Sequence, residues 1–399
     1  MELRNSWRTI SESLISRRTA SHSLGSTRSK DFGRGKWHAL FSKKQRSVLV
    51  PADHPAAQRN GLDFFVTSPL NLLYAKAMLR ANHWLPGANL LPELTLPLVD
   101  GPTFLDQFLT SGSSQLAFLI GTPGPYQKAS VLVMGDDGGP RAFAKVALKE
   151  TADTMISAEA SWLEKIGECQ ALAGKAPKLL KQGKASNGRH YLALSVAPSG
   201  YSTTSNFTAA HASFLRDLST FNPIESSFRE SPAFCYLEHA LSQLRPNLSE
   251  AHFVALTNAL DDCAQHFANW KGPFVLAHGD FAPWNIRVYN DGIFAFDWEY
   301  ASDGASALHD IFHFILAPQA VSGRGVTMGS FLEVCNQAHR YAVESHPNYD
   351  WSPQVVAAHG LAYLLHTILM YSVSQGHVQE SHPVIEAYWR LMEERARWI

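Results

Sequence analysis

The chain has 399 residues, of which 45% are hydrophobic and 17% are charged. This length predicts two domains or lobes, and this composition can bury a sizeable core, which excludes a chain that is disordered throughout. The 34 basic residues nearly balance the 35 acidic residues, for a formal net charge of −1. No global basic field is present, so we expect no nucleic-acid partner.

Residues 1–47 differ in charge from the rest of the chain. They include eleven Lys or Arg, three Asp or Glu and ten Ser. This composition predicts a basic, Ser/Arg-rich and disordered tail. A transit peptide and a segment that contacts an anionic surface are alternatives with the same composition. A secretory signal is not expected, because no apolar stretch of the usual length follows the basic residues.

Residues 48–110 are predicted to form an N-terminal extension packed on the body of the protein. The segment begins with a short apolar run, Val48–Val50. A helical pattern follows near Leu70–Leu79, and prolines then punctuate Leu85–Leu98.

Residues 111–198 are predicted to form a β-rich lobe. Short apolar or alternating runs, separated by Gly- and Pro-rich loops, predict strands, and one longer segment has helical periodicity. The lobe is expected to end at a Pro/Gly hinge near Pro198. The predicted elements are strands at Gln115–Ile120, Ser130–Met134 and Arg141–Leu148, a helix from Thr151 to about Cys169, and a strand at Tyr191–Val196.

Residues 199–399 are predicted to form a mainly helical lobe. Ser249 is a credible N-cap for a helix that runs to Trp270, and Asn290-Asp291-Gly292 predicts a hairpin turn. Further helices are expected near 305–317, 328–345 and 353–375, and from 383 to the end. The apolar run Leu361–Val373 has 13 residues, a length that favours a buried helix, and no transmembrane segment is expected.

The four cysteines are far apart and form no CxxC pair. They favour neither a zinc site nor a disulfide framework. Buried free thiols of this kind are typical of a reducing compartment, so we expect a cytoplasmic protein.

The most specific motif lies between residues 278 and 299. His278-Gly279-Asp280 begins it, Asn285 follows five residues after Asp280, and Asp297 ends an apolar strand twelve residues later. Phosphoryl transfer uses such a set: one carboxylate accepts or orients the attacking hydroxyl, while a second carboxylate and an amide oxygen hold Mg²⁺. The hairpin between Asn285 and Asp297 is expected to fold the three oxygen-bearing side chains around one point.

Lys145 lies on the predicted third strand. A buried ammonium group needs a countercharge or a ligand, and Glu159 follows on the next predicted helix. The alternative for Lys145 is a strand-edge lysine with its head in water. Glu150 and Glu164 are competing partners, but Glu159 lies among small residues, as a packed helix face would.

With these residues the chain resembles the aminoglycoside phosphotransferase/choline kinase family, whose members share a protein-kinase-like fold. The resemblance covers roughly residues 110–399. It implies an α+β fold with a small β-rich N-lobe and a larger α-helical C-lobe, here with an N-terminal extension. It also implies that Asp280 is the catalytic base and that Asn285 and Asp297 bind Mg²⁺.

The same resemblance implies supporting roles for six further residues. Lys145 would bind the α- and β-phosphates of ATP, and Glu159 would hold Lys145. Ser195 and Val196 would offer backbone groups to the adenine. His278 would brace the catalytic loop, and Asp310 would anchor it. The loop Gly121–Gly124 departs from the G-x-G-x-x-G pattern, and Trp284 is bulkier than the family's usual residue beside the reaction centre.

The expected activity is therefore ATP-dependent transfer of the γ-phosphoryl group to a hydroxyl of a small molecule. The acceptor stays open among a sugar-like metabolite, an amino alcohol and an aminoglycoside-like compound. Two alternatives remain: a catalytically silent nucleotide-binding regulatory protein, and a protein kinase acting on Ser residues. Asp297-Trp298-Glu299 runs almost directly into the next helix, without the long activation segment of protein kinases, which favours a small acceptor.

Three other clusters have simpler structural explanations. His309 and His313 have the spacing of metal ligands on a helix, but no third ligand is evident, so buried core histidines are expected. Asp261-Asp262 is expected to lie on a solvated helix face rather than to bind a cationic acceptor. Several aromatic residues are expected in the core rather than in a box for a quaternary amine; these are Trp351, Tyr363, Tyr371, Tyr388 and Trp389.

Overall fold

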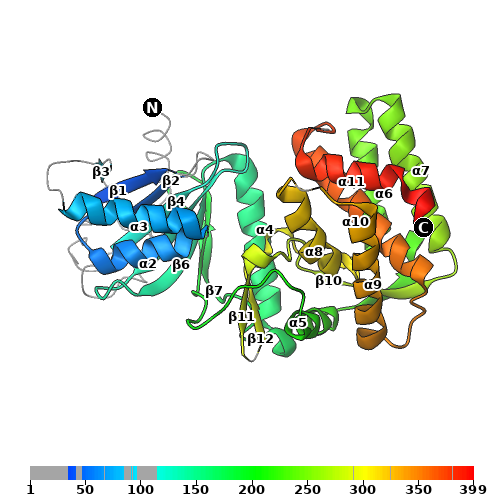
Figure 1. The fold of residues 1–399 in the computed structure, drawn as a ribbon, viewed down its shortest axis with the longest axis horizontal. Helices are drawn as coiled ribbons and strands as arrows, with labels where there is room; N and C mark the ends of the chain where they lie inside the picture. The colour runs from blue at the N-terminus through cyan, green and yellow to red at the C-terminus, as the bar shows by residue number, and fades with distance from the viewer. Residues whose placement is uncertain are drawn as a thin grey trace, which may run out of the picture. The chain divides into compact units, whose positions relative to one another are not determined.

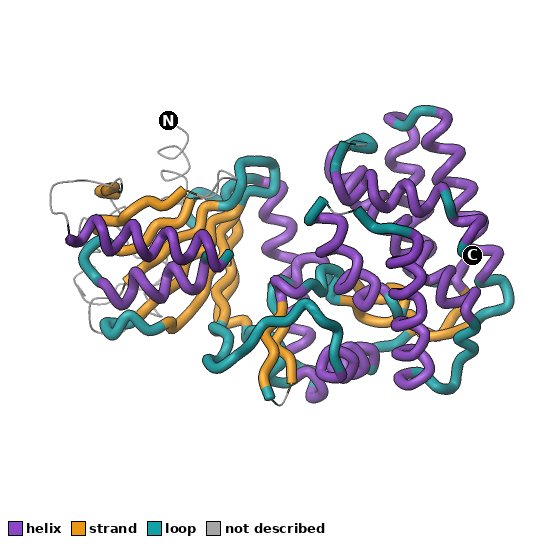
Figure 2. The backbone as a smooth tube through the Cα atoms, viewed as in Figure 1, coloured by secondary structure: helices purple, strands orange, loops and turns teal. Residues whose placement is uncertain are grey.

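The computed structural model of the chain describes residues 35–41, 47–66, 68–84, 91, 93–96, 115–290, 292–323, 325–379 and 381–399. The chain divides into two compact units (Figures 1 and 2). Unit 1 comprises the chain up to Lys165 together with Pro177–Pro198, and unit 2 comprises Ile166–Ala176 and Ser199–Ile399. The main division thus follows Pro198, at the expected hinge.

Unit 1 is built on an eight-stranded antiparallel sheet with the strand order β3-β1-β2-β4-β5-β6-β8-β7. Its central strands are buried on both faces, because residues of alternating direction enter two separate apolar clusters. The strands are β1 (Gly35–Phe41), β2 (Ser47–Pro51), β3 (Glu93–Leu96), β4 (Gln115–Ile120), β5 (Lys128–Met134), β6 (Pro140–Ala147), β7 (Leu179–Lys184) and β8 (His190–Leu194).

Helices α2 (Pro55–Phe65) and α3 (Pro69–Trp84) cover one face of this sheet (Figure 1). Leu62 of α2 is fully buried in the cluster beneath them. The turn between β5 and β6 approaches α2 so closely that a Cβ at Gly138 would lie 2.7 Å from the Ala57 nitrogen. The extension is therefore an integral layer of unit 1.

Two boundaries from the sequence analysis need correction. The predicted tail over residues 1–47 includes β1, which pairs with β2 on one side and β3 on the other. Residues 1–34 lie outside the described part of the chain. The predicted extension over 48–110 is joined to the predicted lobe, because β2 pairs with β4 from Ser47 opposite Ile120.

Helix α4 (Glu150–Gly167) follows β6, and the short segment after it belongs to unit 2 rather than to the predicted N-lobe. The reason is local: Lys175 forms an ion pair with Asp217 (2.5 Å), and its carbonyl oxygen accepts a hydrogen bond from the Ala295 backbone (2.9 Å). Both partners lie in unit 2.

Unit 2 is mainly helical (Figure 2) and contains two small sheets. Strands β9 (Ile224–Ser227), β10 (Lys271–Ala277) and β13 (Ser302–Ser306) form one, and the hairpin β11 (Ile286–Tyr289) and β12 (Gly292–Ala295) forms the other. The helices are α5 (Ala209–Ser219), α6 (Pro232–Leu244), α7 (Glu250–His266), α8 (His309–Val321), α9 (Met328–Ser345), α10 (Pro353–Gln375) and α11 (Pro383–Glu393).

Helix α10 is the core helix of unit 2. With 23 residues it is longer than the apolar run in its sequence, and it alone among the described helices is long and apolar enough to cross a membrane. However, 83% of its apolar window is buried inside the protein, as the core helix of a folded domain would be. Its Ser352 N-cap accepts a hydrogen bond from the Val355 backbone, and Gly376 ends it in a left-handed conformation.

Candidate active site

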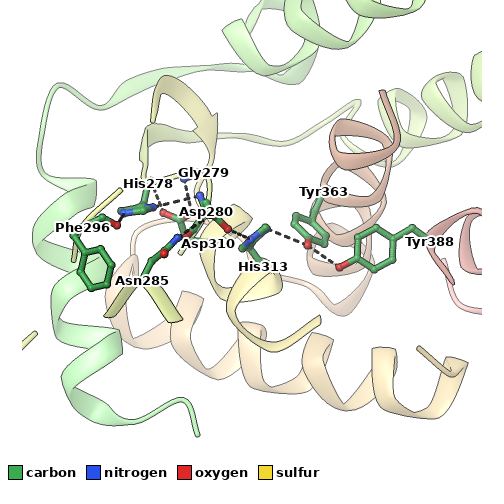
Figure 3. A network of polar contacts seen from close by, with 9 residues as sticks. All are labelled: His278, Gly279, Asp280, Asn285, Phe296, Asp310, His313, Tyr363 and Tyr388. Carbon is green, nitrogen blue, oxygen red and sulfur yellow. Dashed lines mark hydrogen bonds and ion pairs between the residues drawn. The ribbon is translucent and has the colours of Figure 1, made fainter. Parts of the chain in front are cut away.

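The loop after β10 is anchored by a buried carboxylate at the start of α8. The backbone N–H groups of His278 and Gly279 donate to Asp310 Oδ2 (2.7 Å) and Oδ1 (3.0 Å), respectively (Figure 3). Burial raises the pKa of Asp310 to about 6, although both hydrogen bonds favour its charged form. Helix α8 begins at His309, later than predicted, because β13 occupies the preceding residues and pairs with β10.

Gly279 makes the sharp change of direction in this loop. Its φ of +79° lies in the left-handed region, and a Cβ there would lie 2.2 Å from the Tyr300 carbonyl oxygen. Only glycine meets both conditions without displacing the backbone.

His278 connects the loop to the end of strand β12. Its Nδ1 accepts a hydrogen bond from the Asp280 N–H (3.3 Å), and its Nε2 lies 3.2 Å from the Phe296 carbonyl oxygen. Full burial lowers the pKa of His278 to about 4, so the ring is neutral at pH 7 and its Nε2–H donates to Phe296. The histidine therefore links Asp280 to the residue that precedes Asp297.

Asp280 and Asn285 are in direct contact. Asn285 Nδ2 donates to Asp280 Oδ2 (2.7 Å) and to the Asp280 carbonyl oxygen (3.0 Å). The Asn285 carbonyl oxygen accepts from the Phe296 N–H (3.0 Å), which closes the base of the β11–β12 hairpin. The register of that hairpin, Ile286 opposite Ala295, brings Asn285 and Asp297 to the same end.

Asp297 has an unusual backbone conformation, with φ 74° and ψ 60°. Left-handed geometry costs a non-glycine residue about 1–2 kcal/mol, and Asp tolerates it better than most residues. The turn is supported by the Trp298 indole N–H, which donates to the Ala295 carbonyl oxygen (2.9 Å). Backbone strain of this kind is concentrated at functional sites.

Asn285 and Asp297 have the chemistry that Mg²⁺ requires. Because Asn285 turns its amide nitrogen toward Asp280, its Oδ1 accepts no hydrogen bond within the described part of the chain. An amide oxygen and a carboxylate are hard oxygen ligands of the kind that hold Mg²⁺ beside substrate phosphates. The donor set therefore fits this ion.

Asp280 has a second contact that the sequence analysis did not anticipate. His313 Nε2 lies 2.9 Å from Asp280 Oδ1, and His313 Nδ1 lies 3.3 Å from the Tyr363 hydroxyl. Tyr363 in turn contacts the Tyr388 hydroxyl (2.9 Å; Figure 3). The available signal was the spacing from Asp310: residues three apart on a helix share a face, so His313 faces the loop that Asp310 anchors.

In unit 1, Lys145 and Glu159 form a buried ion pair. Lys145 Nζ donates to both carboxylate oxygens of Glu159, at 2.8 Å and 2.6 Å. The two side chains are 9% and 0% exposed. Of the competing partners, Glu164 instead accepts a hydrogen bond from Gln182 (2.7 Å). The ammonium group of Lys145 on β6 is thus buried, and the carboxylate of Glu159 on α4 binds it.

Ser195 and Val196 follow β8 at the end of unit 1. The Ser195 N–H donates to the Lys178 carbonyl oxygen (2.9 Å), and its hydroxyl accepts from the Lys178 N–H (2.9 Å). Those two groups are therefore engaged within unit 1. Val196 packs against the cluster beneath α2 and α3.

The remaining clusters have structural roles in the described residues. Asp262 forms an ion pair with Arg395 (2.6 Å). His309 is buried and packs in ring contact with Tyr363 and His366. Of the aromatic residues expected in the core, three are buried, namely Trp351, Tyr363 and Tyr388.

Comparison with known families decides the assignment. The model of the phosphotransferase enzyme family matches residues 119–324, which are 206 of the 399 residues. This chain belongs to the phosphotransferase enzyme family. The match includes Lys145 and Glu159 of unit 1 and the whole segment from His278 to His313 of unit 2. The family predicted from the sequence and its two-lobed α+β fold are thus confirmed.

A search of curated proteins finds no match to this family member. Among solved structures, a thermostable mutant of aminoglycoside phosphotransferase APH(4)-Ia is similar, with 16% identity, 70% of this chain and 94% of that chain covered, and a TM-score of 0.48. A candidate fructosamine-3-kinase from Thermobifida fusca YX-ER1 has 18% identity, coverages of 69% and 90%, and a TM-score of 0.46. The GDP complex of aminoglycoside 2′-phosphotransferase-IIIa has 15% identity, coverages of 73% and 96%, and a TM-score of 0.45.

Proposed function

We propose that this family member transfers the γ-phosphoryl group of ATP to a hydroxyl of a small molecule, with Asp280 as the catalytic base. The observation that carries the proposal is the fixed orientation of Asp280. Asn285 and His313 each contact one of its carboxylate oxygens. Its backbone is tied to Asp310 through the two preceding residues. A general base has to be held within reach of the proton that it accepts.

In the proposed reaction, the acceptor oxygen forms a bond to the γ-phosphorus while the bond from that phosphorus to the β–γ bridging oxygen breaks. ADP leaves with the bonding electron pair, and the proton of the acceptor hydroxyl moves to Asp280. Most of the rate enhancement in such a reaction comes from positioning and from stabilisation of phosphate charge rather than from covalent chemistry.

Two groups of residues would balance the negative charge of the phosphates. Asn285 and Asp297 would hold Mg²⁺, which supplies positive charge to the transferred phosphoryl group when bound. Lys145, held by Glu159, would bind the α- and β-phosphates. For the adenine, the Ser195 N–H is already engaged, so we assign that contact to the Ser195 carbonyl group and the Val196 backbone.

A small acceptor is favoured by the short chain between Asp297 and α8. Only a short 3₁₀ turn (Trp298–Tyr300) and strand β13 lie between them. Protein kinases place a long activation segment there.

The four cysteines are free and far apart in sequence, which supports the further proposal of a cytoplasmic location.

The proposal is tested by incubating the protein with γ-³²P-labelled ATP, Mg²⁺ and a panel of sugars, amino alcohols and aminoglycosides. Asp280→Asn is expected to lower transfer by about 10²–10⁴-fold. Asp303→Asn is the matched control, because Asp303 is an exposed aspartate on β13, and it is expected to retain full activity.

Two results would contradict this assignment. Label that appears on the protein's own serines in place of the small molecules would support a protein kinase. The absence of both transfer and ADP release would support a catalytically silent nucleotide-binding protein.

A further inference from the structure

We propose that His313 is a positioning residue for the phosphoryl transfer, and that the Tyr363 and Tyr388 hydroxyls fix the orientation of its ring. This inference rests on the proposed role of Asp280 as the base. It concerns the hydrogen bond between Asp280 Oδ1 and His313, a residue outside the motif that contains Asp280.

The polarity of the hydrogen bonds follows from the chemistry of the groups. A carboxylate accepts hydrogen bonds only, so His313 Nε2, at 2.9 Å from Asp280 Oδ1, carries a hydrogen and donates it. In the neutral ring, Nδ1 is then an acceptor, and the Tyr363 hydroxyl at 3.3 Å is its donor. Tyr363 oxygen can in turn accept from the Tyr388 hydroxyl at 2.9 Å.

Burial makes this chain of contacts rigid. Tyr363 and Tyr388 are fully buried, and His313 is 9% exposed. Within the described residues, the Tyr388 hydroxyl has one hydrogen-bond partner, the Tyr363 hydroxyl. A buried hydroxyl that rotated away would lose its one partner, which is costly in a low-dielectric interior. The two tyrosines therefore hold His313 with Nε2 directed at Asp280.

The consequence for Asp280 is a carboxylate restrained at both oxygens. Asn285 Nδ2 holds Oδ2 from one side, and His313 Nε2 holds Oδ1 from the other. Each oxygen keeps a further lone pair with which to accept the proton of the acceptor hydroxyl.

A merely structural role in the core predicts different behaviour from a positioning role. His309 offers the comparison, because it lies one turn earlier on the same helix and is buried at 5% exposure. Its ring stacks beside His313, with centroids 6.4 Å apart and an interplanar angle of 8°. No hydrogen bond to the catalytic loop is found for His309 among the described residues.

The test measures kcat and KM for ATP in four variants by ADP release, with water as the acceptor where no better one is known. His313→Ala is expected to lower kcat by roughly 10- to 100-fold, in line with a lost hydrogen bond to a charged group, and to leave KM for ATP unchanged. His313→Gln is expected to recover most of kcat, because its amide N–H can replace Nε2–H. Tyr363→Phe is expected to lower kcat only several-fold. The control His309→Ala is expected to lower stability without lowering kcat.

A double-mutant cycle separates this inference from the proposed function. In an Asp280→Asn background, His313→Ala is expected to have no further effect on kcat, because its action passes through the carboxylate. Equal losses of kcat in the Ala variants of His313 and His309, or no recovery with His313→Gln, would overturn the positioning role. If Asp280→Asn itself keeps full activity, the proposed function fails and not merely the role of His313.

Discussion

Asp310 shows how a single side chain determines the shape of the loop that carries Asp280. It contacts no atom of the proposed reaction, yet its two oxygens hold the backbone of His278 and Gly279. Burial of the carboxylate raises its pKa to about 6, so the loop depends on a charge that is costly to bury. The two backbone hydrogen bonds offset part of that cost.

Asp310→Asn is therefore expected to lower the free energy of unfolding by about 2 kcal/mol, because one of the two backbone N–H groups then faces an amide NH₂ group instead of an acceptor. Activity should fall with it, since the loop carries Asp280. Urea denaturation and kcat measure the two effects, with Asp303→Asn as the control. A variant as stable and active as the wild type would show that the anchor is dispensable.

At this scale the sequence predicted some of the contacts between site residues and missed others. Asp280, Asn285 and Asp297 were selected because phosphoryl transfer uses such groups at that spacing, and their roles in the reaction stay a prediction. The pairing of Lys145 with Glu159 was expected and is present in the structure. The contact of His313 was missed, because a histidine on an apolar helix looks the same whether it packs in the core or faces a functional carboxylate.

At the scale of elements, the N-terminal layer is the main difference between expectation and structure. Strands β4, β5 and β6 and helices α9 and α10 were predicted almost to the residue, since their apolar patterns are long or bounded by turns. Strands β1 and β3 were not predicted. Strand β1 pairs with the neighbouring β2 and also with β3, which is distant in the sequence. The local pattern of a strand does not show such a distant partner.

The N-terminal layer is expected to be required for the stability of unit 1. Leu62→Ala on α2 should lower the free energy of unfolding by about 2–5 kcal/mol, because Leu62 is fully buried in the cluster shared with β4 and β5. Leu73→Ala on α3 is the matched control. Leu73 is 67% exposed, so its loss should change stability by less than about 0.5 kcal/mol. Equal and small effects in both variants would mean that the extension folds separately from the sheet.

At the scale of the whole molecule, buried histidines determine the response to acid. Burial lowers the pKa of His211 and His278 to about 4 and that of His359 to about 3. In the unfolded chain these groups titrate near their ordinary pKa of about 6.5. Between these values the unfolded chain binds more protons than the folded protein, so stability is present above pH 6.5 and is lost as the pH falls toward 4.

The free energy of unfolding is therefore expected to fall between pH 7 and pH 5, by up to roughly 2 kcal/mol for each buried histidine. Asp310 acts in the opposite direction, because its raised pKa favours the folded protein at low pH, but it is a single group against several histidines whose pKa is lowered by burial. Urea titrations across this range measure the slope. His211→Phe should reduce the slope, since a phenyl ring suits its aromatic neighbours Phe207 and Phe314 and cannot titrate. An unchanged slope would show that His211 does not contribute.

The proposed binding of Mg²⁺ and ATP through Asp297 can be measured by a thermal-shift titration. A ligand that binds only the folded protein raises its apparent stability by RT ln(1 + [L]/Kd). We expect a rise in Tm with ATP that requires Mg²⁺ and is lost in Asp297→Asn, a substitution that keeps a residue tolerant of the left-handed backbone. The absence of any shift with ATP or GTP, or an equal shift in the Asp297→Asn variant, would contradict it.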